Sequence, residues 1–207
     1  MHPNPAFRGA PRDRNLAFAR TRGFGTLAVV AEGAPLMSHI PFLLSEDGTT
    51  AEFHLARSNP IARACKGPLA ARLAVTGPHG YISPDWYGLD DQVPTWNYVA
   101  VHLVGQIEPR PVEDLPDHLS ALSTHFETAQ APKPVWLMDK LTDDMQGRFM
   151  RMILPFRMQV AEIDGTWKLG QNKPDAARLA AAAGLASSPH GEGLDDLARL
   201  MTDLPDT

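Results

Sequence analysis

The segment His54–Pro60, which reads HLARSNP, places a cation, a hydroxyl and a helix start within four residues. Asn59 is suited to cap a helix and Pro60 to stand at its first position, so we expect a helix directly after Arg57 and Ser58. Backbone amides at a helix start, a guanidinium and a hydroxyl together favour an anion. The segment therefore predicts a phosphate site or, as the simpler alternative, a well-capped helix beside a solvated arginine.

A second polar segment, Lys168–Lys173, reads KLGQNK and lies between an expected strand and an expected helix. Its amines and amides can donate hydrogen bonds to a carbonyl-rich or phosphorylated ligand. The same residues can equally serve as a cap and a turn. The residues alone leave both interpretations open.

The stretch Gly77–Gln106 is rich in aromatic residues. Its ends, Gly80–Ser83 and Trp96–Val104, have the β-branched and aromatic composition of strands, whereas Pro84–Pro94 has the composition of an ordered loop. A lone aromatic ring usually packs into a core. Several rings beside Asn97 and a turn-rich loop favour a ligand or subunit contact equally well. The rings are those of Trp86, Tyr87, Trp96 and Tyr98.

Several common catalytic signatures are missing from the sequence. It contains no GxSxG, no Walker-type GxxxxGK[ST], no GxGxxG after an expected strand and no HExxH. The histidines on expected strands, His39, His54 and His102, are better explained as hydrogen-bonded barrel residues than as ligands. We therefore predict no metal site.

Composition excludes further classes of function. The chain has 207 residues, a formal net charge of -5 and a pI near 5.9, which oppose a polyanion-binding surface. The single cysteine, Cys65, is typical of a reducing compartment, and no apolar run has the length of a signal peptide core or a membrane span. We expect a cytoplasmic protein with no membrane segment.

A sheet is needed to position these groups. A helix is expected over Arg14–Arg22, capped by Asp13, and turn residues separate a series of short strands that together suit a small barrel. Pro41 should lie at an edge, a bulge or a barrel corner, because proline cannot donate to a strand ladder. Besides the two strands of the aromatic stretch, the expected strands are 26–31, 36–44, 51–55 and 69–75, with a turn at Glu32–Gly33.

The second half of the chain mixes helices with the remaining strands. Apolar spacing predicts a helical insertion over about 111–147, including a helix over Trp136–Met145. A strand over Phe156–Ile163, a hairpin turn at Asp164–Gly165 and a partner strand over 166–169 should follow. An alanine-rich helix from Pro174 should end at Gly184, and an amphipathic segment should close the chain. We expect a barrel domain over 1–183, and a linker with a tail helix over 184–207.

Six motifs in this order resemble those of PaiB-type FMN-binding negative transcriptional regulators over about the first 175 residues. The fold class implied is mainly β (α+β): an FMN-binding split β-barrel of the pyridoxamine-phosphate-oxidase-like class, with peripheral helices and the helical insertion. The motifs are FGTL (24–27), SHIPFLL (38–44), HLARSNP (54–60), GPHGYISPDWY (77–87), VPTWNYVAVHLVG (93–105) and KLGQNK (168–173).

The resemblance also implies a homodimer with FMN at the subunit interface. The cofactor-binding residues would be His39, Pro41, Arg57, Ser58 and Asn59, with Trp96, Asn97, Tyr98, Lys168, Gln171 and Asn172 contributed by the partner's WNY and KLGQNK motifs. The chain departs from the family pattern at Gly170, where serine is common, and at Ser58, where alanine is common.

The implied function is that of a negative transcriptional regulator or a flavin-dependent sensor. No helix-turn-helix with a basic recognition face is evident, so direct DNA binding is not expected. Two alternatives stay open: an FMN-dependent oxidoreductase of a small substrate, and a haem-binding relative on the same barrel, in which His39, His54 or His102 would ligate iron. Whether the protein is an enzyme is left open by the sequence.

Overall fold

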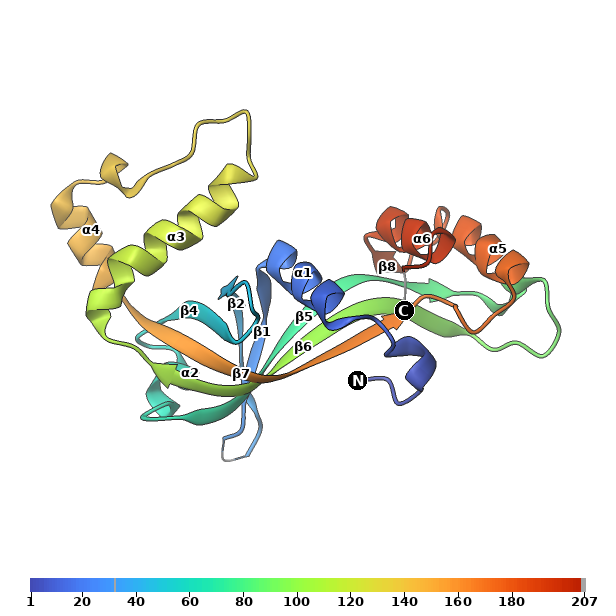
Figure 1. The fold of residues 1–207 in the computed structure, drawn as a ribbon, viewed down its shortest axis with the longest axis horizontal. Coiled ribbons are helices and arrows are strands. Elements are labelled where there is room, and N and C mark those ends of the chain that lie inside the picture. The colour runs from blue at the N-terminus through green and yellow to red at the C-terminus, as the bar shows by residue number, and fades with distance from the viewer. Residues whose placement is uncertain (32, 206–207) are drawn as a thin grey trace. The chain divides into compact units, whose positions relative to one another are not determined.

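The computed structural model describes residues 1–31 and 33–205. These residues form two compact units. Unit 1 comprises Met1–Phe18, Val75–His102 and Ile163–Thr207, and unit 2 comprises Ala19–Ala74 and Leu103–Glu162. The three longest strands, β5 (Leu69–Ile82), β6 (Thr95–Pro109) and β7 (Ile153–Lys168), each contribute residues to both units (Figure 1). No helix in the described part of the chain is long and apolar enough to span a membrane.

The described strands form one sheet in the order β2-β1-β5-β6-β7-β4-β3, and β8 pairs with β5 off this path. Helix and strand are both abundant, as expected for an α+β protein. The other strands are β1 (Phe24–Val29), β2 (Leu36–Pro41), β3 (Leu43–Leu44), β4 (Thr50–Ala56) and β8 (Gly191–Glu192).

Unit 2 contains the first four strands and the short helix α2 (Pro60–Ala64). β1 and β2 form an antiparallel hairpin in which Thr26 lies opposite His39. Glu32, at the expected turn of this hairpin, lies outside the described residues. β4 pairs with β7, and the stacked rings of Phe53 and Phe156 are completely buried where they meet. Pro41 ends the edge strand β2, in agreement with the prediction for this proline.

The helical insertion also lies in unit 2 and contains α3 (Leu115–Thr128) and α4 (Asp143–Met150). The expectation of a helix over Trp136–Met145 was wrong by several residues. The helix begins only after Thr142, whose hydroxyl accepts the backbone N–H of Met145 as an N-cap. The backbone N–H of Trp136 is instead satisfied by the Glu127 carboxylate at 2.9 Å.

Unit 1 carries α5 (Asp175–Leu185) and α6 (Leu194–Thr202), which pack together over a buried apolar cluster. The cluster includes Tyr87 of the 3-10 turn η2 (Pro84–Tyr87) and Trp167 of β7. Gly184 does not end α5, as the sequence suggested, but lies inside the helix. A Cβ there would overlap the ring of Trp86, so this glycine makes room for a tryptophan.

Unit 1 also contains the 3-10 turn η1 (Pro5–Phe7) and most of α1 (Arg12–Arg22). α1 begins directly after Pro11, one residue before Asp13, which was the expected cap. β7 runs without a break through Asp164–Gly165, so the expected hairpin there was wrong. Asp164 forms an ion pair with Arg8 at 2.9 Å, and a Cβ at Gly165 would overlap the side chain of Asn15. These two residues serve packing against the N-terminal segment rather than a turn.

The aromatic stretch was predicted as two strands and a loop. Its second strand is part of β6, and Pro84–Tyr87 forms the turn η2. The segments expected as separate strands at 69–75 and 80–83 are one strand, β5, which continues through Gly77 and Pro78. Gly77 is accommodated because its bare backbone faces Phe18 and Val99, where a Cβ would be crowded.

Candidate functional site

In unit 2, two of the motifs come together at one place. His39 and Pro41 lie on β2, and Arg57 and Ser58 follow β4. Asn59 connects the two segments: its Oδ1 accepts the backbone N–H of Ile61 at 2.9 Å, and its Nδ2 donates to the Ser38 hydroxyl at 3.0 Å. The structure therefore confirms the predicted N-cap and joins the start of SHIPFLL to the end of HLARSNP.

Arg57 is exposed and held at its base. Its Nε donates to the backbone carbonyl of Arg151 at 2.6 Å, and its backbone N–H donates to the carbonyl of Met152 at 2.9 Å. Among the described residues, no carboxylate pairs with this guanidinium. The stem of Arg57 is thus positioned while its terminal amino groups keep their capacity to bind an anion.

The helix after Arg57 is short. α2 has only five residues, so the partial charge at its N-terminus contributes little to anion binding. The anion-binding capacity of this place comes instead from the guanidinium of Arg57 and the hydroxyls of Ser38 and Ser58. Guanidinium and hydroxyl donors suit a phosphate, so the residues present fit the phosphate end of FMN.

His39 is exposed beside this cluster, and its Nδ1 lies 2.9 Å from the Thr26 hydroxyl on the neighbouring strand. That hydrogen bond orients the ring and leaves its other nitrogen for a partner. The prediction that His39 and His54 are hydrogen-bonded strand residues is confirmed, because Nδ1 of His54 lies 3.1 Å from Nε2 of His118. His118 was not singled out from the sequence.

In unit 1, the WNY segment presents two rings and one buried amide. Trp96 is 45% exposed, and its ring lies near those of His79 and Tyr81 at centroid distances of 6.1 and 6.3 Å. Tyr98 is half-buried, and burial raises the pKa of its phenol. Asn97 is only 1% exposed, and its Nδ2 donates to the sulfur of Met201 at 3.4 Å.

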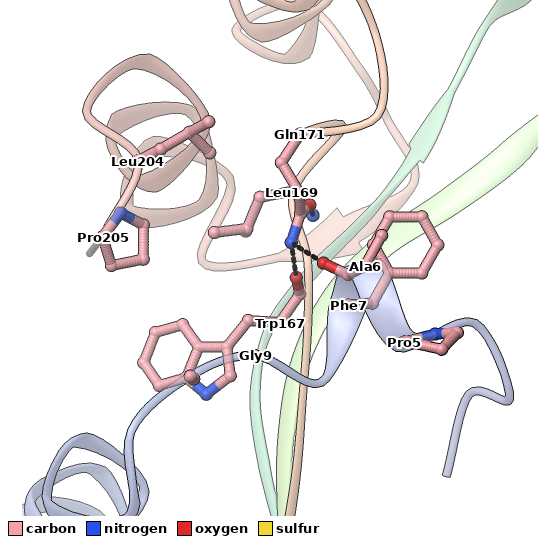
Figure 2. Close-up of a pocket in the computed structure, with 10 residues that line it drawn as sticks. Pro5, Ala6, Phe7, Gly9, Trp167, Leu169, Gln171, Leu204 and Pro205 are labelled. Carbon is pink, nitrogen blue, oxygen red and sulfur yellow. Dashed lines mark hydrogen bonds between the residues drawn. The ribbon is translucent and has the colours of Figure 1, made fainter. Parts of the chain in front are cut away.

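The KLGQNK segment follows the end of β7. Gln171 closes a local turn by accepting the backbone N–H of Leu169 at 2.8 Å. Its Nε2 donates to the carbonyls of Trp167 at 2.6 Å and Ala6 at 3.1 Å, and Figure 2 shows both of these hydrogen bonds. Gln171 therefore fastens the N-terminal segment to β7.

Two cavities of unit 1 adjoin this segment. The larger, of about 680 Å³, lies beside Trp167 and Leu169 and is shown in Figure 2. The smaller, of about 230 Å³, is lined by Asn97, Lys168 and Asn172. The same wall includes Lys173, a residue of the KLGQNK motif that the sequence did not identify as a site residue. Its position beside Lys168 depends on the turn at Gly170, where φ is 79°, and this could be anticipated from the glycine.

Comparison with known proteins identifies the family. Residues 1–162 match the family described as "Putative FMN-binding domain". The chain belongs to this FMN-binding family. The match covers five of the six motifs and confirms both the family resemblance and the expectation of FMN as the cofactor. Residues 163–207, which include KLGQNK, α5 and α6, lie beyond the matched part of the FMN-binding domain.

Individual relatives agree with membership of the FMN-binding family. The chain is 30% identical over 158 residues to "Protease synthase and sporulation protein PAI 2" of Bacillus subtilis, covering 75% of each protein. It is 26% identical over 199 residues to an uncharacterized protein of Aspergillus fumigatus, covering 72% of this chain and 76% of that protein. The agreement with PAI 2 supports the PaiB-type resemblance.

Solved structures confirm the fold class. The FAD and heme binding protein from Mycobacterium smegmatis has a TM-score of 0.57 and 20% identity, covering 86% of this chain and 80% of that one. The flavocytochrome Anf3 from Azotobacter vinelandii has a TM-score of 0.53 and 11% identity, covering 81% and 72%. At these identities the likeness concerns the fold alone, which is the flavin-binding split barrel.

Proposed function

We propose that this protein is a homodimeric, flavin-dependent sensor or regulator of the PaiB type, with FMN held at the subunit interface. Membership of the FMN-binding family identifies FMN as the cofactor. The observation that carries the proposal is the convergence of SHIPFLL and HLARSNP around an exposed arginine whose stem is fixed by the carbonyl of Arg151. PAI 2, whose name refers to protease synthesis and sporulation, supports a regulatory role.

In this proposal, Arg57, Ser58 and Asn59 hold the phosphate of FMN, and His39 and Pro41 border its ring system. Arg57 and Ser58 supply donors, while Asn59 positions the segment through its cap and its bond to Ser38. When bound, FMN supplies a ring system that can accept and release electrons and hydride equivalents. The protein's part is to bind, orient and shield that ring.

The second subunit would contribute the Trp96–Tyr98 and Lys168–Asn172 segments. The rings of Trp96 and Tyr98 suit contact with a flat aromatic ligand. Asn97 and Gln171, whose side chains bond within unit 1, would shape the wall rather than reach the flavin. Lys168 and Asn172 would line the cavity at this place.

Exposed apolar side chains support a dimer. Leu89 is 43%, Val93 72% and Trp96 45% exposed, all within the aromatic stretch. Exposed apolar side chains of this size are costly to leave in water when they are contiguous, and a second subunit commonly covers them. Sedimentation velocity at micromolar concentration should show a dimer. A stable monomer with this segment accessible to protease would contradict the proposal.

Regulation in this proposal does not use tight, direct reading of DNA. DNA affinity requires positively charged side chains that neutralise phosphates, and the net charge of -5 opposes such binding. A cytoplasmic flavoprotein can instead signal through its ligand state and through partners. Retention of its own promoter at physiological salt, with discrimination against scrambled DNA, would show that this part is wrong.

An FMN-dependent oxidoreductase is the second candidate. Tyr98 favours it, because burial keeps its phenol protonated and able to donate a hydrogen bond or proton. Turnover of a nicotinamide reductant by the FMN-loaded protein, lost in Tyr98→Phe, would establish this activity. A haem-binding role would require His39, His54 or His102 as the iron ligand, and His39 and His54 are hydrogen-bonded to Thr26 and His118. An absorption spectrum after haem addition tests this role.

The decisive experiment for FMN binding is a flavin-fluorescence titration of wild type and Arg57→Ala with both FMN and riboflavin. Loss of a charge-assisted hydrogen bond should weaken FMN binding by about 10- to 150-fold. Riboflavin, which has no phosphate, should bind both proteins equally. Arg63→Ala is the matched control, since Arg63 is an exposed arginine on α2. Equal loss of both flavins in Arg57→Ala would remove the phosphate role from Arg57.

A further inference from the structure

The smaller of the two cavities beside KLGQNK brings together two lysines and two asparagines. It lies where β7 ends and the chain turns through Gly170 toward α5, opposite the loop before β6. We call it the lysine cavity. Its volume is about 230 Å³, and its walls comprise Asn4, Phe7, Tyr87, Asp91, Gln92, Val93, Thr95, Asn97, Lys168, Gly170, Asn172 and Lys173.

The two lysines of the cavity are held by neutral partners. Nζ of Lys168 donates to the carbonyl of Trp96 at 2.8 Å and to the Thr95 hydroxyl. Nζ of Lys173 donates to Oε1 of Gln92 at 2.5 Å. Within the described residues, neither ammonium forms an ion pair. Two positive charges are therefore fixed around one small space by neutral hydrogen-bond acceptors.

An aromatic ring lies near each of the two ammonium groups. Nζ of Lys168 lies 5.9 Å from the centroid of the Phe7 ring, and Nζ of Lys173 lies 5.2 Å from that of Tyr87. Burial lowers the pKa of Lys168, and the charge of Lys173 lowers this pKa further. The two charges thus act on each other across the cavity, and a bound anion would relieve their repulsion.

Asn97 adds a buried amide to the lysine cavity. It lines the lysine cavity, is 1% exposed, and donates from Nδ2 only to the Met201 sulfur, which is a weak acceptor. Asp91 contributes a carboxylate to the wall but is exposed and forms no ion pair within the described residues. The buried amide of Asn97 is thus held by a weak acceptor, and the two lysines are held by neutral ones.

We infer that the lysine cavity binds the anionic group, a carboxylate or a phosphate, of a small molecule other than FMN. This molecule would be the signal or substrate of the flavoprotein, and in that respect the inference rests on the proposed function. Lys168 and Lys173 provide the charge, and Asn97 and Asn172 provide amide donors. The volume admits the anionic end of a metabolite rather than a whole nucleotide.

The test uses the FMN-loaded protein and calorimetric titration with two probes, inorganic phosphate and acetate. At least one probe should bind wild type, and the better probe distinguishes a phosphate ligand from a carboxylate ligand. Lys168→Met and Lys173→Met should each weaken that binding by about tenfold or more. Lys66→Met is the matched control, because Lys66 is an exposed lysine of unit 2, and it should bind the probe as wild type does.

A second measurement uses only the wild-type protein, so it applies even if a lysine variant fails to fold. Acetic anhydride should modify Lys168 of the wild-type protein, and the bound probe should slow that modification selectively. Absence of binding by both probes, or binding unchanged in both lysine variants, would overturn the inference. So would competition between phosphate and FMN with no effect on riboflavin, because the cavity would then hold the flavin's own phosphate. FMN titration without these anions tests the flavin proposal separately.

Discussion

Nδ1 of His54 and Nε2 of His118 share a hydrogen bond of 3.1 Å that ties β4 to α3 within unit 2. The rings meet edge to face, with centroids 5.3 Å apart. Such a bond requires one donor nitrogen and one acceptor nitrogen. If both imidazoles are charged, neither ring has an acceptor nitrogen and the bond is lost. Burial lowers the pKa of both histidines, and the charge of His54 further lowers the pKa of His118, to about 4.

This pair predicts destabilisation by acid. The unfolded chain takes up a proton at His118 near its ordinary pKa of 6.5, whereas the folded protein does so only near 4. The stability that neutral His118 contributes to the folded protein is therefore fully present above pH 6.5. This stability is lost as the pH falls from about 6.5 to about 4. The loss from His118 should be on the order of 2 kcal/mol.

Urea unfolding at several pH values between 7.5 and 4.5 measures this dependence. His118→Gln should flatten it, whereas His125→Gln, on the same helix, should keep the wild-type slope. The charged groups around His118 are those of Glu52, Arg110, Asp114, Asp117 and Arg157, which line the same cavity. A slope unchanged in His118→Gln would assign the acid sensitivity to these carboxylates instead.

Gly105 should tolerate no side chain. A Cβ at this position in β6 would overlap the backbone carbonyl of Gln159, which cannot move as a side chain can. Gly105→Ala should lower the free energy of unfolding by about 2–3 kcal/mol. Gly67→Ala, where a Cβ meets nothing within 4 Å, should change it by less than about 0.5 kcal/mol. Equal chemical denaturation midpoints would show that β6 and β7 can separate locally.

Arg178 joins the two C-terminal helices. It is 6% exposed, donates from Nη1 to the carbonyls of Met201 and Thr202, and pairs with Asp175 at 2.8 Å. Arg178→Met should cost about 2 kcal/mol, because it strands the last carbonyls of α6. Hydrogen exchange should become faster in α6 first. Arg199→Met, which removes an exposed pair with Asp196, should leave both measurements near wild type.

Asn15 holds the indole of Trp167. Its Oδ1 accepts the indole N–H at 2.8 Å, and both side chains are buried. Asn15→Leu should cost about 1–3 kcal/mol by leaving the indole N–H without a partner. Near-ultraviolet circular dichroism should weaken in proportion. An unchanged melting temperature and unchanged dichroism would mean that water or another acceptor replaces the amide.

The sequence predicted strands, caps and family better than it predicted the purpose of its glycines. Gly165 and Gly184 were interpreted as a turn and a helix stop, because glycine usually marks such positions. Both instead make room for a side chain from a distant segment, Asn15 and Trp86 respectively. Local pattern carries no information about which remote side chain will need the space.

The candidate site was predictable in part for the same reason. The cap by Asn59 is a local signal and was found, and the family motifs pointed to SHIPFLL and HLARSNP together. The bond from Asn59 to Ser38 and the pairing of His54 with His118 depend on tertiary placement across 21 and 64 residues. The cavity beside Lys173 likewise requires the loop before β6, which sequence spacing alone could not place against it.

The segment from Asn4 to Ala10 supplies walls to the two cavities beside KLGQNK, and Gln171 holds it there through the carbonyl of Ala6. Proteolytic cleavage within this segment, or a bulky tag inserted there, would therefore remove binding surface. Two preparations that differ only at this end should give different ligand affinities. Samples intended for binding work should therefore be checked by mass spectrometry for an intact segment 4–10.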